Sequence, residues 1–247
     1  MSTRLVHLVI DAADPSRQAA FWAAALGWEV AADEPDEVVA WPAGFDYPGI
    51  AALPLVFVPV AEPKTGKNRV HLDLASASLD DQAATVSRLR DLGAVPADIG
   101  QGEVPWVVLA DPEGNELCVL DPRPSYRGTG PVAAVVIDCA DPGRLASFWT
   151  EAAGWRADAG RQLDDLVALR SVSGAGPFLE LLRAPGAKTG KNRIHPDVAP
   201  FPGGDINAEA ARLRALGATA VDVGQGDVSW VVLADPEGNE FCVLTPR

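Results

Sequence analysis

The sequence predicts an α+β protein of two tandem domains, each composed of two strand–helix–three-strand modules. Three observations support this fold class. Residues 106–116 and 230–240 of the 247-residue chain are identical in all eleven positions. Further motifs repeat in the same order, at an offset of 127 residues in the early part of the repeat and 124 later. Within each repeat, the hydrophobic pattern runs twice through a strand, a helix and three strands.

The length of the repeat indicates two domains and argues against a solenoid. A period near 120 residues is much longer than solenoid units, which span about 20–50 residues. We therefore predict one domain at residues 1–123 and a homologous one at residues 131–247. Residues 124–130 are rich in turn-forming residues with little to bury, and they are predicted to be the linker.

The first module begins with an apolar strand at residues 5–11. Asp14 or Ser16 is expected to cap a helix that continues to Leu26, and Gly27 ends it. Extended segments are predicted at residues 28–31, 38–41 and 53–60. Pro54 and Pro59 are expected to shorten the last of these or to place it at a sheet edge.

The second module repeats this order from residue 69. A strand at residues 69–74 precedes a helix that is predicted to start at Asp80 or Asp81 and to end at Gly93. Strands follow at 95–99, 106–110 and 116–120. Asp111-Pro112-Glu113-Gly114 predicts a type I turn between the last two, because proline suits its second position and glycine its fourth. Residues 132–244 repeat the whole plan.

Composition limits the possible partners. A net charge of −14 argues against nucleic acid and anionic membranes, both of which need basic surfaces. The sequence has no basic, apolar leader and no apolar run near 20 residues, so we expect a cytoplasmic protein that binds a small molecule, as a monomer or a homodimer. Cys118 and Cys242 lie in apolar strands and are expected to be buried, reduced thiols.

Two motifs carry a family resemblance. Asn68-Arg-Val-His-Leu-Asp73 and Asp111-Pro-Glu-Gly-Asn-Glu116, in this modular context, resemble the vicinal oxygen chelate superfamily and most closely its glyoxalase-like branch. The resemblance covers the whole chain. It implies that paired modules form an open, cupped, eight-stranded mixed sheet with helices outside. It also implies a divalent metal (Fe, Mn, Ni or Zn) in the cup.

The resemblance implies metal ligands from the first, fifth and eighth strands, sometimes with one from the fourth. In the first domain these positions hold His7, His71 and Glu116. In the second domain Ala134 replaces the first histidine, so its metal site is expected to be degenerate. A weaker second ligand set there consists of Glu180, His195 and Glu240.

Other residues are candidates for supporting roles. Asp73 shares a strand face with His71 and is a candidate general base. Arg69 and Trp106 are candidates for the substrate pocket. The structural alternative is that His71 is hydrogen-bonded within the sheet while Glu116 pairs with Arg69. The basic loop at residues 64–69, repeated at 188–193, either contacts an anion or is a solvated connector.

Two functions therefore compete. The first is a metal-dependent enzyme, of the lyase/isomerase or dioxygenase type, that acts on a small oxygenated molecule. The second is a metal-free protein that binds a small molecule or an antibiotic, as bleomycin-resistance proteins do. The sequence leaves open whether modules pair within a repeat or exchange between repeats.

Overall fold

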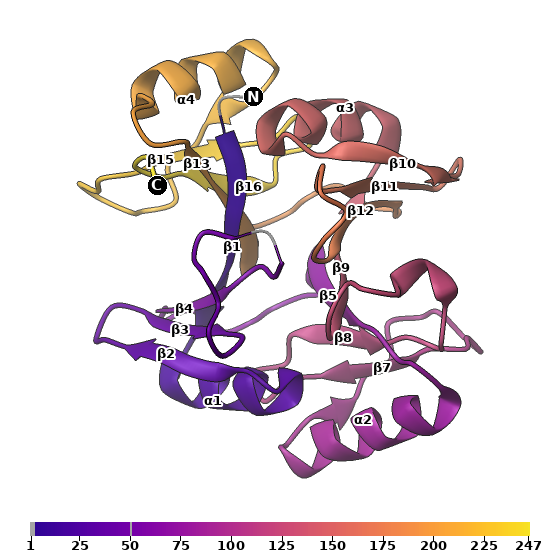
Figure 1. Ribbon diagram of the computed structural model, residues 1–247. Helices are drawn as coiled ribbons and strands as arrows, with labels where there is room; N and C mark the ends of the chain where they lie inside the picture. The colour runs from indigo at the N-terminus through magenta and orange to yellow at the C-terminus, as the bar shows by residue number, and fades with distance from the viewer. Residues whose placement is uncertain (1–2, 50) are drawn as a thin grey trace.

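The computed structural model describes residues 3–49 and 51–247, which form two eight-stranded mixed sheets and four α-helices (Figure 1). This confirms the predicted fold class. Each strand–helix–three-strand module is present, and the modules follow one another in the predicted order.

The first module forms much as its local signals predict. It contains β1 (Thr3–Ala12), α1 (Pro15–Leu26), β2 (Glu29–Asp33), β3 (Val38–Trp41) and β4 (Leu55–Pro59). Asp14 caps α1, because its carboxylate accepts a hydrogen bond from the Arg17 backbone N–H. Gly27 ends the helix with φ of 68°, a left-handed conformation that costs glycine little.

The second module differs from the prediction at its helix start. It contains β5 (Val70–Leu74), α2 (Leu79–Asp91), β6 (Val95–Pro96), β7 (Val107–Ala110) and β8 (Glu116–Val119). Ser78 caps α2 by accepting from the Asp81 N–H, so the helix begins one residue before Asp80. Asp80 and Asp81 lie in its first turn, where carboxylates favour the positive end of the helix dipole.

The second repeat follows after a short 3₁₀ helix, η1 (Pro124–Tyr126), within the linker segment. The third module contains β9 (Val132–Cys139), α3 (Pro142–Ala153), β10 (Arg156–Gln162), β11 (Leu166–Arg170) and β12 (Phe178–Arg183). The fourth contains β13 (Ile194–Pro200), α4 (Ile206–Ala215), β14 (Thr219–Ala220), β15 (Val231–Ala234) and β16 (Glu240–Val243).

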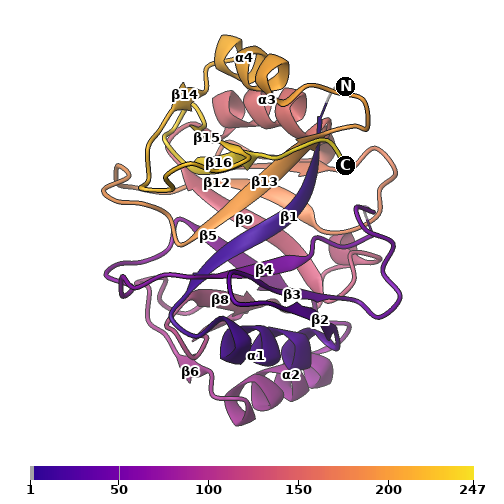
Figure 2. The same ribbon diagram turned by 90° about the vertical axis from the view of Figure 1, so that its left-hand side faces the viewer.

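The modules exchange between the repeats. Sheet A has the strand order β14-β15-β16-β13-β1-β4-β3-β2 and therefore joins the first module to the fourth. Sheet B has the order β10-β11-β12-β9-β5-β8-β7-β6 and joins the second module to the third. Antiparallel pairs β1–β13 and β5–β9 make the two central junctions. Figure 2 shows β1 and β13 side by side through the middle of the molecule. Each sheet thus contains one module from each repeat.

Strand β4 lies inside its sheet, between β1 and β3. Pro54 and Pro59 shorten it to five residues but do not place it at an edge. Pro54 precedes the strand, and Pro59 is its last residue, so both avoid the middle of the hydrogen-bonded ladder.

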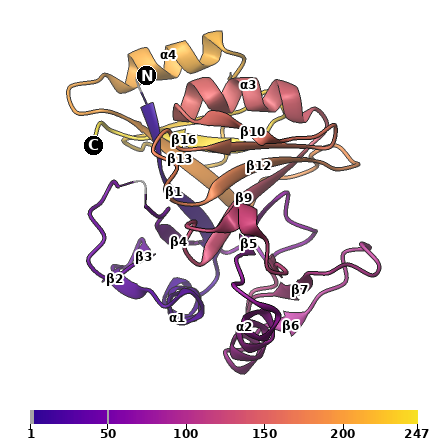
Figure 3. The ribbon, with the colours of Figure 1, turned by 45° about the vertical axis from the view of Figure 1, so that its right-hand side comes forward.

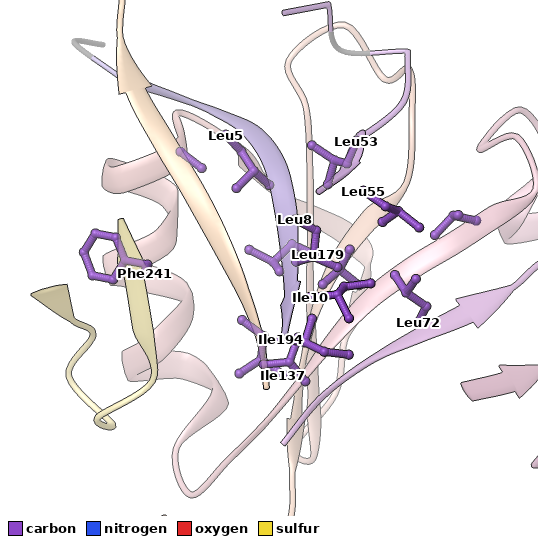
Figure 4. Close-up of a cluster of buried hydrophobic side chains, with 14 of the residues drawn as sticks. Leu5, Leu8, Ile10, Leu53, Leu55, Leu72, Ile137, Leu179, Ile194 and Phe241 are labelled. Carbon is purple, nitrogen blue, oxygen red and sulfur yellow. The ribbon is translucent and has the colours of Figure 1, made fainter. Parts of the chain in front are cut away.

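One continuous hydrophobic core connects the two sheets. Leu8 and Ile10 of sheet A pack with Leu72 and Ile137 of sheet B, and all four are at most 2% exposed (Figure 4). The helices pack on the faces of the sheets that carry this core. Helices α1 and α2 lie at one end of the molecule and α3 and α4 at the other (Figure 3). The opposite face of each sheet is therefore not covered by helices.

The repeated hairpin joins neighbouring modules. The Gly114 N–H donates to the Asp111 carbonyl at 2.9 Å, which closes the predicted turn. The Asp111 carboxylate accepts from Gln18 and from the Trp22 indole of α1. Glu113 accepts from two backbone N–H groups just before α1. Asp235 and Glu237 repeat the contacts with Trp149 and the start of α3. The duplicated sequence therefore has a structural role.

None of the helices in the described ranges is both long and apolar enough to cross a membrane.

Candidate functional sites

Polar side chains gather on the face of sheet A that points away from the common core. Because side chains alternate along a strand, His7 lies on this face while Leu8 packs in the core. In the β1–β13 ladder His7 is paired with Asp197. In the parallel β13–β16 ladder Asp197 is paired with Cys242. We call His7, His195, Asp197 and Cys242 site A.

The donor atoms of His195, Asp197 and Cys242 lie within 4.8 Å of one another, and His7 contacts the same aspartate. The Nε2 atom of His7 is 2.9 Å from Asp197 Oδ2, and the Nε2 atom of His195 is 3.5 Å from Asp197 Oδ1. The Cys242 sulfur is 3.6 Å from His195 Nε2. Asp197 thus lies between two imidazoles that belong to different repeats.

Burial sets the ionisation of site A. It lowers the pKa of His195, although the Asp197 carboxylate opposes this, so His195 is a neutral imidazole near pH 7. Burial, assisted by Asp197, raises the pKa of the Cys242 thiol well above its ordinary value. Among the described residues His195 Nδ1 has no hydrogen-bond partner. His195 therefore keeps one unprotonated ring nitrogen for a cation, whereas the Cys242 thiol must lose its proton to become a metal ligand.

Tyr47 closes one side of site A. Its hydroxyl is 3.3 Å from His7 Nδ1 and accepts a hydrogen bond from Arg247 at 3.1 Å. Its ring stacks on Trp41, with 5.9 Å between the centroids. Burial raises the pKa of Tyr47, so the hydroxyl keeps its proton and can donate to the imidazole. Tyr47 therefore helps to orient His7 with Nε2 toward Asp197.

Sheet B carries an equivalent cluster on its outer face. His71, Asp73 and Cys118 each offer a donor atom within 4.8 Å of the others, as do His195, Asp197 and Cys242 in sheet A. We call His71, Asp73, Cys118 and Glu180 site B. The distance from His71 Nε2 to Asp73 Oδ1 is 3.4 Å. Opposite Asp73, where site A has a histidine, β9 has Ala134.

Site B contains an ion pair that site A lacks. Arg161 Nη2 is 2.7 Å from Glu180 Oε1, and the Tyr126 hydroxyl donates to the same oxygen at 3.0 Å. The guanidinium lies over the rings of Tyr126 and Phe178, 4.3 and 4.9 Å from their centroids. Burial raises the pKa of Glu180 to about 7, although Arg161 opposes the shift. Arg161 and two aromatic rings therefore surround the Glu180 carboxylate.

The donors of site A suit a divalent metal ion. Bond lengths of about 2.0–2.3 Å around tetrahedral zinc separate neighbouring donor atoms by roughly 3.3–3.8 Å. The separations from His195 Nε2 to Asp197 and to the Cys242 sulfur, 3.5 and 3.6 Å, lie in that range. His7 Nε2 is at hydrogen-bonding distance from Asp197, 2.9 Å, so its imidazole must shift to become a ligand. Imidazole and thiolate donors favour zinc, nickel or iron over magnesium and calcium.

The comparison with protein families now identifies the fold. The family model described as Glyoxalase-like domain matches residues 7–120 and again residues 134–244. The chain belongs to the glyoxalase-like domain family. It is thus a member of the vicinal oxygen chelate superfamily, as its motifs suggested.

Solved structures of this superfamily share the fold. Glyoxalase I from Zea mays is 14% identical, with a TM-score of 0.66 over 99% of this chain and 92% of that chain. A putative dioxygenase from Bacillus subtilis subsp. subtilis str. 168 is 15% identical, with a TM-score of 0.64 over 99% of this chain and 85% of that chain. No curated protein sequence matches the chain. At these identities the likeness concerns the fold alone.

The ligand set expected for the first domain is not brought together in this glyoxalase-like protein. His7 lies in sheet A, whereas His71 and Glu116 lie in sheet B. Glu116 accepts hydrogen bonds from Lys64 Nζ at 2.7 Å and from the Asn68 N–H at 3.1 Å. It belongs to neither of the donor clusters that the described residues form. The physical reason is module exchange, which pairs β1 with β13 instead of β5.

The weaker second set is divided in the same way. Glu180 lies in sheet B, and His195 and Glu240 lie in sheet A. Glu240 accepts from Lys188 Nζ at 2.6 Å and from the Asn192 N–H at 3.1 Å. Both repeated glutamates therefore fix the basic loop that precedes β5 or β13.

The residues predicted to support the site lie in different parts of the structure. Asp73 lies beside His71, as its place on the strand predicted. Trp106 packs at the edge of site B under Arg123, with its indole donating to Gln101. Arg69 lies away from site B, on the wall of a cleft between the two repeated basic loops. It donates to the Asp138 carbonyl and lies 3.6 Å from Glu237, so it does not form the expected pair with Glu116.

Several residues of the two sites were not predicted from the sequence. Asp197 and Cys242 complete site A, while Tyr126 and Arg161 fill site B. A signal for the first two was present, since His-x-Asp occurs at both strand starts and both cysteines follow the glutamates by two residues. No local pattern marked Tyr126 or Arg161, because the linker and an edge strand bring them to the site.

Proposed function

We propose that this glyoxalase-like protein is a divalent-metal-dependent enzyme whose metal is held in site A, and that it transforms a small oxygenated molecule. The observation that carries the proposal is the cluster of His195, Asp197 and Cys242, whose donor atoms lie within 4.8 Å of one another, with His7 of the other repeat 2.9 Å from Asp197. Zinc, nickel and iron suit these donors. Manganese, also expected from the sequence, suits the thiol less well.

A metal bound by four protein donors keeps positions free only if it is five- or six-coordinate. Two adjacent free positions suit a substrate with two neighbouring oxygens, whereas a four-coordinate zinc ion would leave the site closed and structural. When bound, the metal would polarise those oxygens and stabilise developing negative charge on them.

The chain's own residues supply orientation and a dry environment. His7 is held between Asp197 and the Tyr47 hydroxyl, which fixes its ring nitrogens. Apolar residues of the same face, among them Val6, Val232 and Leu244, exclude water around Cys242.

Metal analysis of the purified protein tests the proposal. We expect about one equivalent of zinc, nickel or iron per chain, and His7→Ala should weaken metal binding roughly a hundredfold or more, because one ligand is removed. Substitution with cobalt gives a second measurement. Its visible spectrum reports the coordination number, and a near-ultraviolet sulfur-to-cobalt band should disappear in Cys242→Ser.

The control is His71→Ala, which removes the imidazole of site B. It should leave metal content near that of the unmodified protein. A protein that holds no metal after incubation with each ion, yet copurifies with an organic ligand, contradicts the enzyme proposal. That outcome would favour the metal-free binding function.

A further inference from the structure

A cleft lies between equivalent loops of the two repeats, and none of its lining residues belongs to site A or site B. Its volume is about 960 Å³, and residues 59–69 and 185–193 form most of its wall. The hexapeptide Lys-Thr-Gly-Lys-Asn-Arg occurs once in each loop, at 64–69 and at 188–193. Module exchange brings the two copies to one cleft, so the cleft presents the same chemical groups twice.

The lysines of the chain are concentrated here. The sequence contains four lysines and sixteen arginines, and all four lysines line this cleft. They are Lys64, Lys67, Lys188 and Lys191. Lysine differs from arginine in carrying a compact, strongly hydrated charge with three rotatable donors. Their confinement to one place distinguishes the cleft from the rest of an acidic protein.

Two of the lysines are the exposed members of their ion pairs. Lys67 pairs with Asp138 and Lys191 with Asp11, each across the boundary between repeats. The lysine side chains are 39% and 38% exposed, whereas those of the aspartates are 10% and 7% exposed. A solute that enters the cleft therefore meets the ammonium groups before the carboxylates.

The cleft also has donors that the protein does not use. Across residues 3–49 and 51–247, the hydroxyls of Thr65 and Thr189 have no hydrogen-bond partner, and both residues are exposed. The Arg193 Nε atom, on the same wall, is buried without a partner among those residues. Each loop thus offers an ammonium group and a hydroxyl that can donate to an oxyanion.

We propose that this cleft binds a small molecule carrying two anionic groups, phosphate or carboxylate, with one group at each loop. Lys67 and Thr65 hold one anion, and Lys191 and Thr189 hold the other. The inner lysines, Lys64 and Lys188, stay with Glu116 and Glu240 and keep the loops in shape. None of these residues belongs to site A, so this proposal stands independently of the metal.

Calorimetric titration of the full chain tests it, with pyrophosphate, succinate and inorganic phosphate as probes in a low-chloride buffer. We expect saturable binding of one pyrophosphate or one succinate per chain. The tighter of the two identifies the anionic group. The variant Lys67→Gln/Lys191→Gln should bind at least roughly tenfold more weakly, because it loses two charge-assisted contacts.

Two further variants separate binding from general charge and from folding. Arg17→Gln/Arg90→Gln makes the same change in net charge on exposed residues outside the cleft and should bind as the unmodified protein does. Thr65→Val/Thr189→Val leaves the ion pairs in place and should bind several-fold more weakly, with an unchanged circular dichroism spectrum. This second variant remains informative if the lysine variant fails to fold.

Three results would overturn the proposal. The first is no saturable binding of any probe to the unmodified protein. The second is an equal loss of affinity in the arginine control, which would mean that net charge alone attracts the anion. The third is independent binding of two inorganic phosphates with no gain from linking them in pyrophosphate.

Discussion

Sites A and B share three positions and differ at two. A histidine, an aspartate and a cysteine are common to both: His195, Asp197 and Cys242 in site A, and His71, Asp73 and Cys118 in site B. The facing strand adds His7 to site A but Ala134 to site B. The fourth strand of the same module adds Val56 to site A but Glu180 to site B.

These differences between the two sites result from module exchange. Within the sequence, Ala134 belongs to the same repeat as His195, which made the second repeat look degenerate. In the structure Ala134 faces Asp73, and His7 faces Asp197. Site A therefore has two imidazoles, whereas site B has one imidazole and the buried Glu180–Arg161 pair. A duplicated chain has thus made one site suited to a metal and one filled by its own side chains.

The largest expected difference between the sites concerns the shared aspartate. Asp197→Ala removes a carboxylate between two imidazoles and should weaken metal binding roughly a hundredfold or more. Asp73→Ala removes a carboxylate that contacts only His71 among the ring nitrogens, and it should change metal affinity by less than about threefold. Competition with a chromophoric chelator measures both. Equal losses would show that the sites share the metal function.

A second prediction separates ligands from structural glutamates. Glu116→Gln and Glu240→Gln each break a nearly buried pair with a lysine and should lower the free energy of unfolding by about 1–3 kcal/mol. Urea denaturation measures this loss, which should be similar in the two repeats. Metal content should not change. Loss of metal from either variant would show that the glutamate is a metal ligand.

The smallest effect is a pH dependence confined to site B. Because burial raises the folded-state pKa of Glu180 from 4.5 to about 7, the folded state binds the proton more tightly than the unfolded state does. Stability from this group is complete below pH 4.5 and is lost as the pH rises toward 7. We expect a loss of about 1–2 kcal/mol across that window.

Glu180→Gln tests this dependence, because glutamine still accepts hydrogen bonds but does not ionise. Its free energy of unfolding should fall less between pH 4.5 and 7 than that of the unmodified protein. The exposed Glu62→Gln serves as the control and should keep the original slope. If Glu180→Gln also keeps it, Glu180 is ionised throughout this range.

Local sequence signals predicted the elements and their faces. Asp14 and Gly27 bound α1 because capping depends on one side chain and one backbone conformation. Alternation along β5 correctly placed Asp73 on the same strand face as His71. The predicted start of α2 was wrong by one residue, because Ser78 and the two aspartates after it all favour a helix N-terminus.

Strand partners could not be predicted from the same signals. The two repeats are so similar that β1 can bury the same kind of apolar face against β5 or β13, and periodicity does not distinguish these pairings. The candidate ligands His7, His71 and Glu116 were assigned from a within-repeat pairing. That assignment failed when the structure joined the first module to the fourth.

The sequence by itself determined the duplication, the order of strands and helices, the superfamily and the shared strand face of His71 and Asp73. These depend on contacts between neighbouring residues or on motifs that are contiguous in the chain. Only the tertiary structure decided that His7 meets Asp197, that Glu116 binds Lys64 and that the two lysine loops share a cleft. Those contacts join residues from 52 to 190 positions apart, so they depend on which modules pair.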